Sequence, residues 1–285
     1  MSLATITLNV DPFIELGPLT LAWHGLMIAV GVVVGGWLAL RYGRERGLDA
    51  ERLLTLIMII AIAGIVGSRL FYLAENDAAA LLQPGDWLGT LGFSFYGAMI
   101  LGTAAAAVNL RAHGLGIRYL DALAAGFPLG LAVGRIGDVI NGEHYGPVSD
   151  LPWAIRNLHP DADVPSSAVA YHSGGLYEIM LALAIFALIW PLRHRFQRPG
   201  VLLWTVIALY SAGRFAMFFV RSDSDGVAVG LNSAQWTSVA LLVIAAGGLW
   251  LVKTRPSPSP ATHQPGNLHR PWPTADPPHG EAEKP

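Results

Sequence analysis

The sequence predicts an all-α protein that crosses a membrane seven times. Apolar residues make up 53% of the 285 residues and charged residues only 13%, whereas soluble domains carry about 25% charged residues. Apolar runs of about 20 residues, the length that a helix needs to span a bilayer, recur along the chain. This composition argues against a soluble enzyme, a disordered protein or a nucleic-acid-binding protein, and the net charge of −2 offers polyanions no general attraction.

Each predicted span is an apolar run between polar connections. The second contains LIMIIAIAGIVG, which has no polar face at helical period and therefore does not suit the core of a soluble protein. The fourth contains Pro128, which a membrane helix tolerates as a kink. The fifth is the shortest. The seven runs lie near residues 19–41, 53–74, 93–111, 119–140, 175–192, 201–220 and 232–252.

The basic residues of the connections predict the orientation, because cytoplasmic loops are enriched in Lys and Arg. One side of the membrane receives 13 basic residues and the other only Arg156 and Arg221. We therefore expect the N-terminus outside and the C-terminus in the cytoplasm, with the first apolar run retained because no basic residue precedes it. The 13 residues are Arg41, Arg44, Arg46, Arg52, Arg111, Arg118, Arg193, Arg195, Arg198, Lys253, Arg255, Arg270 and Lys284.

The chain divides into a membrane domain over residues 1–252 and a tail over residues 253–285. Nine of the 19 prolines fall in residues 256–285, a composition typical of a disordered cytoplasmic tail. Within the membrane domain, small residues at four-residue spacing indicate that the first and fourth spans pack closely. These are Gly31 and Gly35 in the first span, and Gly126, Gly130 and Gly134 in the fourth.

Three arginines, Arg69, Arg135 and Arg214, lie inside the second, fourth and sixth spans. An arginine at membrane depth costs on the order of 3 kcal/mol, which makes it a candidate functional residue. All three spans run outward and each arginine lies in the outer half, so we expect the guanidiniums at one depth. They repel one another unless an anion lies between them, and phosphate fits because the guanidinium fork binds it through two hydrogen bonds. The structural alternative is that each side chain extends to the interface.

Other polar residues are expected at the same outer depth. His24 opens the first span, Tyr96 the third, and Tyr210 precedes Arg214 by one helical turn. His172, Tyr177 and Glu178 stand near the start of the fifth span. A single His or Tyr at this depth is usually an interfacial anchor, but six spans together predict a polar site at the outer leaflet.

The segment GRIGDVINGEHYG, residues 134–146, resembles the signature of bacterial prolipoprotein diacylglyceryl transferases, G-R-x-G-N-F-x-N-x-E-x-x-G. Weaker similarities follow the family's order: WHGL to its first-helix Tyr-Gly-Leu, GSR with Tyr72 to its second-helix arginine motif, HSGGLYE to H-P-[ST]-Q-L-Y-E, and YSAGR to Y-x-x-x-R. The resemblance covers about residues 18–250.

The chain departs from the family's motifs at several positions. Asp138 stands where the family has Asn, and Phe218 where it usually has Glu. His24 stands at its usual first-helix Tyr, and Tyr96 at the His of its third-helix His-Gly-Gly, so imidazole and phenol have exchanged helices. Ser173 and Gly175 replace the Pro and Gln of the fifth-helix motif.

The resemblance implies transfer of a diacylglyceryl group from phosphatidylglycerol to the cysteine thiol of a lipoprotein precursor in the bacterial inner membrane, with the active site facing the outer leaflet. We expect Arg135 and Arg214 to hold the phosphate, and His24 or Tyr96 to assist thiol deprotonation. Arg69 is either a third phosphate contact or, as we favour, structural. The other substrate-binding candidates are Asp138, Asn141, Glu143, Gly146 and Tyr210.

Phosphatidylglycerol, lipoprotein precursors and membrane lipids are the expected partners, with no nucleic acid. No cofactor or metal is expected, because the chain has no cysteine and its histidines are scattered without an HExxH spacing. Two alternatives remain: a non-catalytic or altered-specificity phospholipid-binding relative, which the departures at Tyr96 and Phe218 favour, and a small anion transporter. A transporter should place charges through the whole membrane thickness and show symmetry between its halves, and neither pattern is present.

Overall fold

The computed structural model describes residues 5–17, 19–83, 85–88, 92–221 and 226–254. The predicted tail therefore lies, from residue 255 onward, outside the described residues. Seven α-helices occur in the described ranges, and each overlaps one predicted span. They are α1 (Trp23–Glu45), α2 (Ala50–Asn76), α3 (Phe95–Ala112), α4 (Arg118–Asn141), α5 (Gly174–Leu192), α6 (Val201–Met217) and α7 (Ser233–Thr254).

Five of the described helices, α1, α2, α4, α5 and α7, are long and apolar enough to cross a membrane. Helix α6 is apolar but shorter, at 17 residues. The sixth predicted span extends to residue 220, but α6 ends at Met217 and turn structure comes next. The chain is therefore a mostly helical membrane protein.

Short strands accompany the helices, which the all-α prediction did not include. A four-stranded sheet has the order β1-β5-β6-β4, and two hairpins pair β2 with β3 and β7 with β8. Strands of two to four residues are too short to show a period-2 pattern in the sequence. Their bounds are β1 (Ile6–Leu8), β2 (Phe13–Leu16), β3 (Leu19–Ala22), β4 (Tyr145–Val148), β5 (Ile155–Asn157), β6 (Tyr171–Ser173), β7 (Gly226–Ala228) and β8 (Leu231–Asn232).

The first predicted span was wrong at its start. Residues 19–22 are not helical but form β3, which pairs antiparallel with β2. Gly17 adopts a φ of 63° between the two strands, a left-handed conformation that glycine accepts without strain. Because a short apolar run suits a strand as well as a helix, the sequence could not distinguish the two. Helix α1 begins at Trp23, so His24 lies in its first turn.

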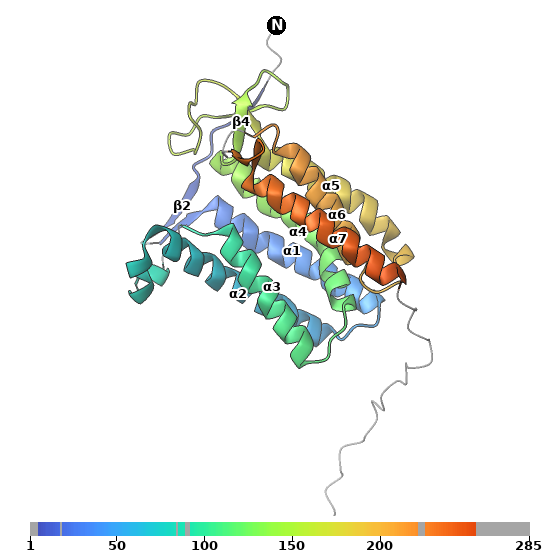
Figure 1. Ribbon diagram of the computed structural model, residues 1–285. Coiled ribbons are helices and arrows are strands. Elements are labelled where there is room, and N and C mark those ends of the chain that lie inside the picture. The colour runs from blue at the N-terminus through green and yellow to red at the C-terminus, as the bar shows by residue number, and fades with distance from the viewer. Residues whose placement is uncertain (1–4, 18, 84, 89–91, 222–225, 255–285) are drawn as a thin grey trace, which may run out of the picture. The chain divides into compact units, whose positions relative to one another are not determined.

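The helices pack mainly as the pairs α1–α4, α2–α3, α6–α7 and α4–α5 (Figure 1). The close approach of α1 and α4 confirms the prediction from their glycines. A Cβ atom added to Gly130 would lie 2.6 Å from the carbonyl oxygen of Gly31, and one added to Gly35 would lie 3.2 Å from that of Gly126. The two backbones thus touch directly, which fixes the axial position of α1 on α4.

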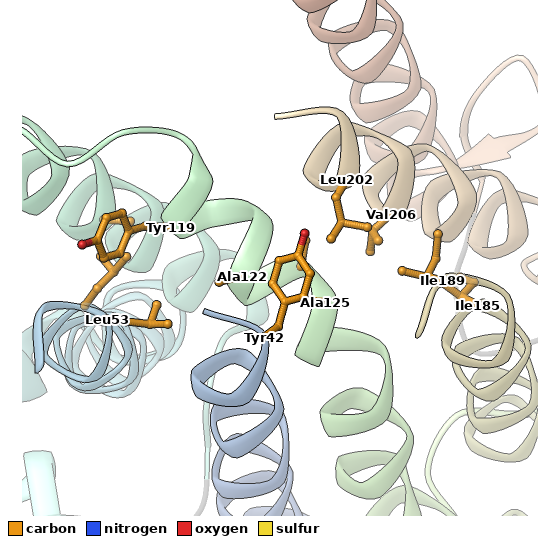
Figure 2. Close-up of a cluster of buried hydrophobic side chains, with 12 residues drawn as sticks. Tyr42, Leu53, Tyr119, Ala122, Ala125, Ile185, Ile189, Leu202 and Val206 are labelled. Carbon is orange, nitrogen blue, oxygen red and sulfur yellow. The ribbon is translucent and has the colours of Figure 1, made fainter. Parts of the chain in front are cut away.

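A buried hydrophobic cluster holds together the ends of the helices that lie away from His24. Tyr42 of α1, Leu53 of α2, Ile189 of α5 and Leu202 of α6 belong to it (Figure 2), and each is at most 2% exposed. Asp121 of α4 accepts hydrogen bonds from the backbone N–H groups of residues 200 and 203 at the start of α6, at 2.6 and 2.8 Å. The Asp121 cap and the hydrophobic cluster hold α1, α4, α5 and α6 together at one end of the bundle. This packing fixes the positions of the polar residues at the other end.

Gly130→Ala should destabilise the protein because its new Cβ would have to push the α1 backbone away. Gly247→Ala in α7 is the matched control, since a Cβ there meets no atom within 4 Å. Thermal unfolding of both variants in detergent measures the effect. We expect a clearly lower midpoint only for Gly130→Ala, and equal midpoints would contradict direct glycine packing.

Candidate active site

Charged side chains from four helices meet at one end of the bundle. Helix α1 contributes its first turn, α4 its last two turns, α5 its second turn and α6 its last turns. The turn after α4 adds a further carboxylate. The side chains joined by described contacts, which we call the charged cluster, are His24, Arg135, Asp138, Asn141, Glu143, Glu178, Tyr210 and Arg214.

Glu178 is the centre of the charged cluster. Its side chain is 1% exposed, and its two carboxylate oxygens bind guanidiniums from two different helices. Arg135 Nε lies 2.8 Å from Oε2, and Arg214 Nη1 lies 2.6 Å from Oε1. Tyr210 also donates its hydroxyl hydrogen to Oε1. A carboxylate this deeply buried needs such partners, because an unpaired charge in a low-dielectric interior is strongly unfavourable.

Asp138 connects Arg135 to His24. One carboxylate oxygen, Oδ2, forms an ion pair with Arg135 Nη1, and the other, Oδ1, lies 2.7 Å from His24 Nδ1. The Asp138 side chain is 1% exposed. The same His24 nitrogen lies 3.0 Å from Glu143 Oε2, and Asn141 Nδ2 donates to Glu143 Oε1 at 2.9 Å. The contacts therefore form one continuous chain from α1 through α4 and α5 to α6.

The end of α4 is shaped to place Glu143 beside His24. Gly142 has a φ of 78° and ends the helix in the left-handed conformation, while the N–H of Glu143 donates to the carbonyl of Asp138 at 3.0 Å. Burial raises the pKa of the Glu143 carboxyl, but the bonds from His24 and Asn141 outweigh it and hold that pKa below its ordinary value. Glu143 is thus held as a carboxylate.

Close backbone approach brings His24 within reach of α4. A Cβ atom on Gly137 would lie 2.6 Å from His24 Cα. A Cβ atom on Gly175 of α5 would lie 3.1 Å from Asp138 Cβ. Small residues at these two positions leave the room that the His24–Asp138 contact occupies.

Aromatic and basic groups surround the charged cluster. The Arg214 guanidinium lies 5.1 Å from the centre of the Phe218 ring and 5.7 Å from that of Phe95, distances typical of cation–π contacts. His144 Nε2 lies 3.7 Å from Asp138 Oδ2, and its Nδ1 is 2.8 Å from Arg221 Nη2. Phe218 therefore offers a ring face where the family motif usually has a Glu.

Two predicted residues lie apart from these contacts. Arg69 donates to the backbone carbonyls of residues 86 and 92, the latter at 2.8 Å, and lies over the rings of Tyr72 and Phe93. It therefore ties α2 to the connection before α3. Tyr96 is 38% exposed at the start of α3, with its ring against Phe95.

Gly146, a third predicted residue, is buried in β4. A Cβ atom added there would lie 2.2 Å from the carbonyl oxygen of Val220. This glycine therefore lets the strand lie against the turn after α6, and it presents no side chain to a ligand.

Two groups in the described chain bring possible metal ligands within 4.8 Å of one another. One is His24, Asp138 and Glu143 within the charged cluster, and the other is Asp11, His159 and Asp161 near the four-stranded sheet. In the second group the two aspartates are exposed. Exposed acidic groups are common without an ion, so this group has no distinguishing feature of a metal site.

The family model of prolipoprotein diacylglyceryl transferases matches residues 12–251. The chain belongs to this family. It is 34% identical over 263 residues to the phosphatidylglycerol–prolipoprotein diacylglyceryl transferase of Paenarthrobacter aurescens, covering 85% of this chain and 82% of that protein. The relatives named alike from Thermosynechococcus vestitus and Geobacillus kaustophilus are 33% and 35% identical, covering 87% and 85% of this chain and 94% and 91% of theirs.

From the sequence, only a phosphate group was predicted to lie between the arginines of this family member. In the structure, a carboxylate of the chain itself lies there. Glu178 lies between Arg135 and Arg214 and balances one of their two positive charges, while Asp138 forms an ion pair with Arg135. Glu178 was expected at the right depth but was given no role in the site. An acidic residue in an apolar span was the available signal, since it requires a basic partner as surely as each arginine requires an acidic one.

Glu178→Gln should destabilise the protein by about 3 kcal/mol, because it removes the buried anion from two guanidiniums. Glu75→Gln is the control: Glu75 is exposed in α2, and its loss should cost less than about 0.5 kcal/mol. Reversible denaturation in mixed detergent micelles measures both free energies. Similar losses in the two variants would show that Glu178 does not hold the cluster together.

Proposed function

We propose that the charged cluster is the site at which this protein transfers a diacylglyceryl group from phosphatidylglycerol to prolipoproteins. The protein is a transferase of lipoprotein biosynthesis by family and by similarity. The comparisons do not favour a non-catalytic phospholipid-binding relative or an anion transporter. Our proposal adds to the family assignment that the phosphate binds at the charged cluster.

The observation that carries this proposal is that both arginines retain unused N–H donors. Arg135 uses Nε for Glu178 and Nη1 for Asp138, and Arg214 uses Nη1 for Glu178 and Tyr210. In the described part of the chain, no hydrogen-bond or ion-pair partner contacts Arg135 Nη2, Arg214 Nη2 or Arg214 Nε. The two side chains are 14% and 17% exposed, so a ligand can reach them. Two fixed guanidiniums with free donors suit one phosphate group.

The proposed chemistry is attack by the precursor's cysteine sulfur on the glyceryl carbon that carries the phosphate. The thiol loses its proton to solvent, a C–S bond forms, and the C–O bond to phosphate breaks. Glycerol phosphate leaves with the bonding electron pair. Arg135 and Arg214 stabilise this charge as it develops, which lowers the barrier because the interaction is stronger in the transition state than with the bound lipid. The nucleophile comes from the substrate, in keeping with a chain that has no cysteine.

The remaining candidates receive roles that fit their positions. His24 and the arginines supply positive charge that favours the thiolate, since a free thiol with a pKa near 8.5 is mostly protonated at neutral pH. Tyr96, at the exposed start of α3, is a hydrogen-bond donor toward the substrates. Asn141, Glu143 and Tyr210 position the lipid headgroup. Arg69 is structural, supported by its bonds to backbone carbonyls.

We further propose seven membrane spans, including α3 and α6, with the N-terminus outside and the C-terminus in the cytoplasm. Support comes from the 13-to-2 distribution of basic residues in the connections. This orientation puts the charged cluster at the outer leaflet of the bacterial inner membrane. An acceptor protein exported across that membrane would meet phosphatidylglycerol there.

The test is to incubate the purified protein with phosphatidylglycerol and a peptide that contains a lipobox cysteine, and then to measure the peptide's mass. We expect a mass increase of one diacylglyceryl group, which disappears when the peptide's cysteine is replaced by serine. Unmodified cysteine peptide, under conditions in which a related transferase modifies it, would contradict the proposed function.

A further inference from the structure

His24 and Asp138, two of the positions at which the chain departs from the family's motifs, touch each other. His24 Nδ1 lies 2.7 Å from Asp138 Oδ1 across the glycine-lined contact between α1 and α4. The motifs have Tyr and Asn at these positions, both uncharged. The chain has instead a residue that can be cationic beside one that is anionic, so the two changes together leave the charge of the pair unaltered.

The charges of the cluster balance only when His24 is included. Asp138, Glu143 and Glu178 supply three negative charges, and Arg135 and Arg214 supply two positive charges. Protonated His24 restores neutrality. The His24 side chain is in direct contact with both Asp138 and Glu143.

Two further basic groups lie on the other side of Asp138. His144 Nε2 is 3.7 Å from Asp138 Oδ2, and His144 Nδ1 is 2.8 Å from Arg221 Nη2. The His144–Asp138 distance exceeds that of His24, whose Nδ1 lies 2.7 Å from Oδ1. His24 is therefore nearer to the Asp138 carboxylate than His144 is.

We propose that His24 is a positioning residue for lipid binding: as an imidazolium it balances the charge of Asp138 and so keeps Arg135 available to the phosphate. Without His24, the Asp138 carboxylate loses one of the two cations in direct contact with it and keeps Arg135, and the site as a whole gains one negative charge. An anionic headgroup is then repelled, and Asp138 holds Arg135 more strongly. This inference rests on the proposed function, since it concerns the same phosphate site.

The contacts of His24 hold its imidazole ring in one orientation. Both carboxylates that contact Nδ1 are held by second partners, Asp138 by Arg135 and Glu143 by Asn141. The ring therefore cannot turn without breaking two contacts. Its other nitrogen, Nε2, has no polar partner in the described part of the chain, and the side chain is 33% exposed. The positive charge is thus accessible to a headgroup as well as to the carboxylates.

The test is a double-mutant cycle on the affinity for a short-chain phosphatidylglycerol, measured by calorimetry in detergent without any acceptor peptide. His24→Tyr should weaken binding about tenfold, as expected for one uncompensated charge near the phosphate. Asp138→Asn alone should bind at least as tightly as the unaltered protein. His24→Tyr combined with Asp138→Asn should return to within about threefold of the unaltered protein.

Two further variants keep the cycle interpretable. His24→Gln replaces His24→Tyr where the larger ring does not fit, with the same expected rescue by Asp138→Asn. His24→Tyr combined with Asp150→Asn removes an exposed carboxylate elsewhere and should stay weak. The proposal is overturned by normal binding in both His24 variants, or by double variants with Asp138→Asn that bind no better than the single His24 variants.

A metal ion at the same three ligands is the competing explanation. Affinity that falls on chelation and returns with Zn²⁺ would overturn the charge-balance proposal, whereas affinity unaffected by chelation supports it. Because the measurement needs no transfer, its outcome is independent of the mass assay. A protein that lipidates the peptide but shows no rescue would refute this inference and leave the proposed function standing.

Discussion

The site depends on one carboxylate that is buried between two guanidiniums. Glu178 of α5 binds Arg135 of α4 and Arg214 of α6, and thereby joins three helices at one end of the bundle. Each arginine alone would be unfavourable at this depth, and so would the glutamate. Together they form a framework whose remaining N–H donors have no hydrogen-bond partner among the described residues. The positive charge of the proposed phosphate site is thus part of the fold itself.

Packing elsewhere in the bundle determines where this framework sits. The glycines of α1 and α4 allow backbone contact along much of both helices and continue to Gly137, where α4 meets His24. At the other end, Asp121 caps α6 and the cluster around Tyr42 closes the bundle. Because both ends of α4 are fixed, Arg135 and Asp138 have little freedom to move. Rigid support of this kind is what a site needs to bind a charged group specifically.

Hydrophobic composition and buried charge made the helices and most of the polar site residues predictable from the sequence. All seven helices were expected, because long apolar runs are unmistakable, and Arg135, Arg214 and His24 stood out as polar groups in or near them. The short strands were not predicted, since the pattern in a run such as LTLA suits helix and strand alike. For Arg69 the sequence favoured a structural role over a phosphate contact, and its described bonds go to loop carbonyls.

The sequence could not show which charged residues on different helices contact one another. Glu178, Arg135 and Arg214 lie far apart along the chain, and no spacing rule relates residues on three different helices. The contact between His24 and Asp138 was hidden for the same reason, although both departures from the motifs were visible. Contacts between elements are decided by how the helices pack.

The rate of diacylglyceryl transfer by Arg135→Lys tests most directly whether the guanidinium pair on Glu178 is the phosphate site. Lysine keeps the charge but not the planar fork, so transfer should fall by at least about tenfold with normal expression and folding. Arg69→Lys, whose described hydrogen bonds go to backbone carbonyls, should retain most of its activity. Near-normal transfer by Arg135→Lys, or a greater loss in Arg69→Lys, would contradict the assignment of the phosphate to this pair.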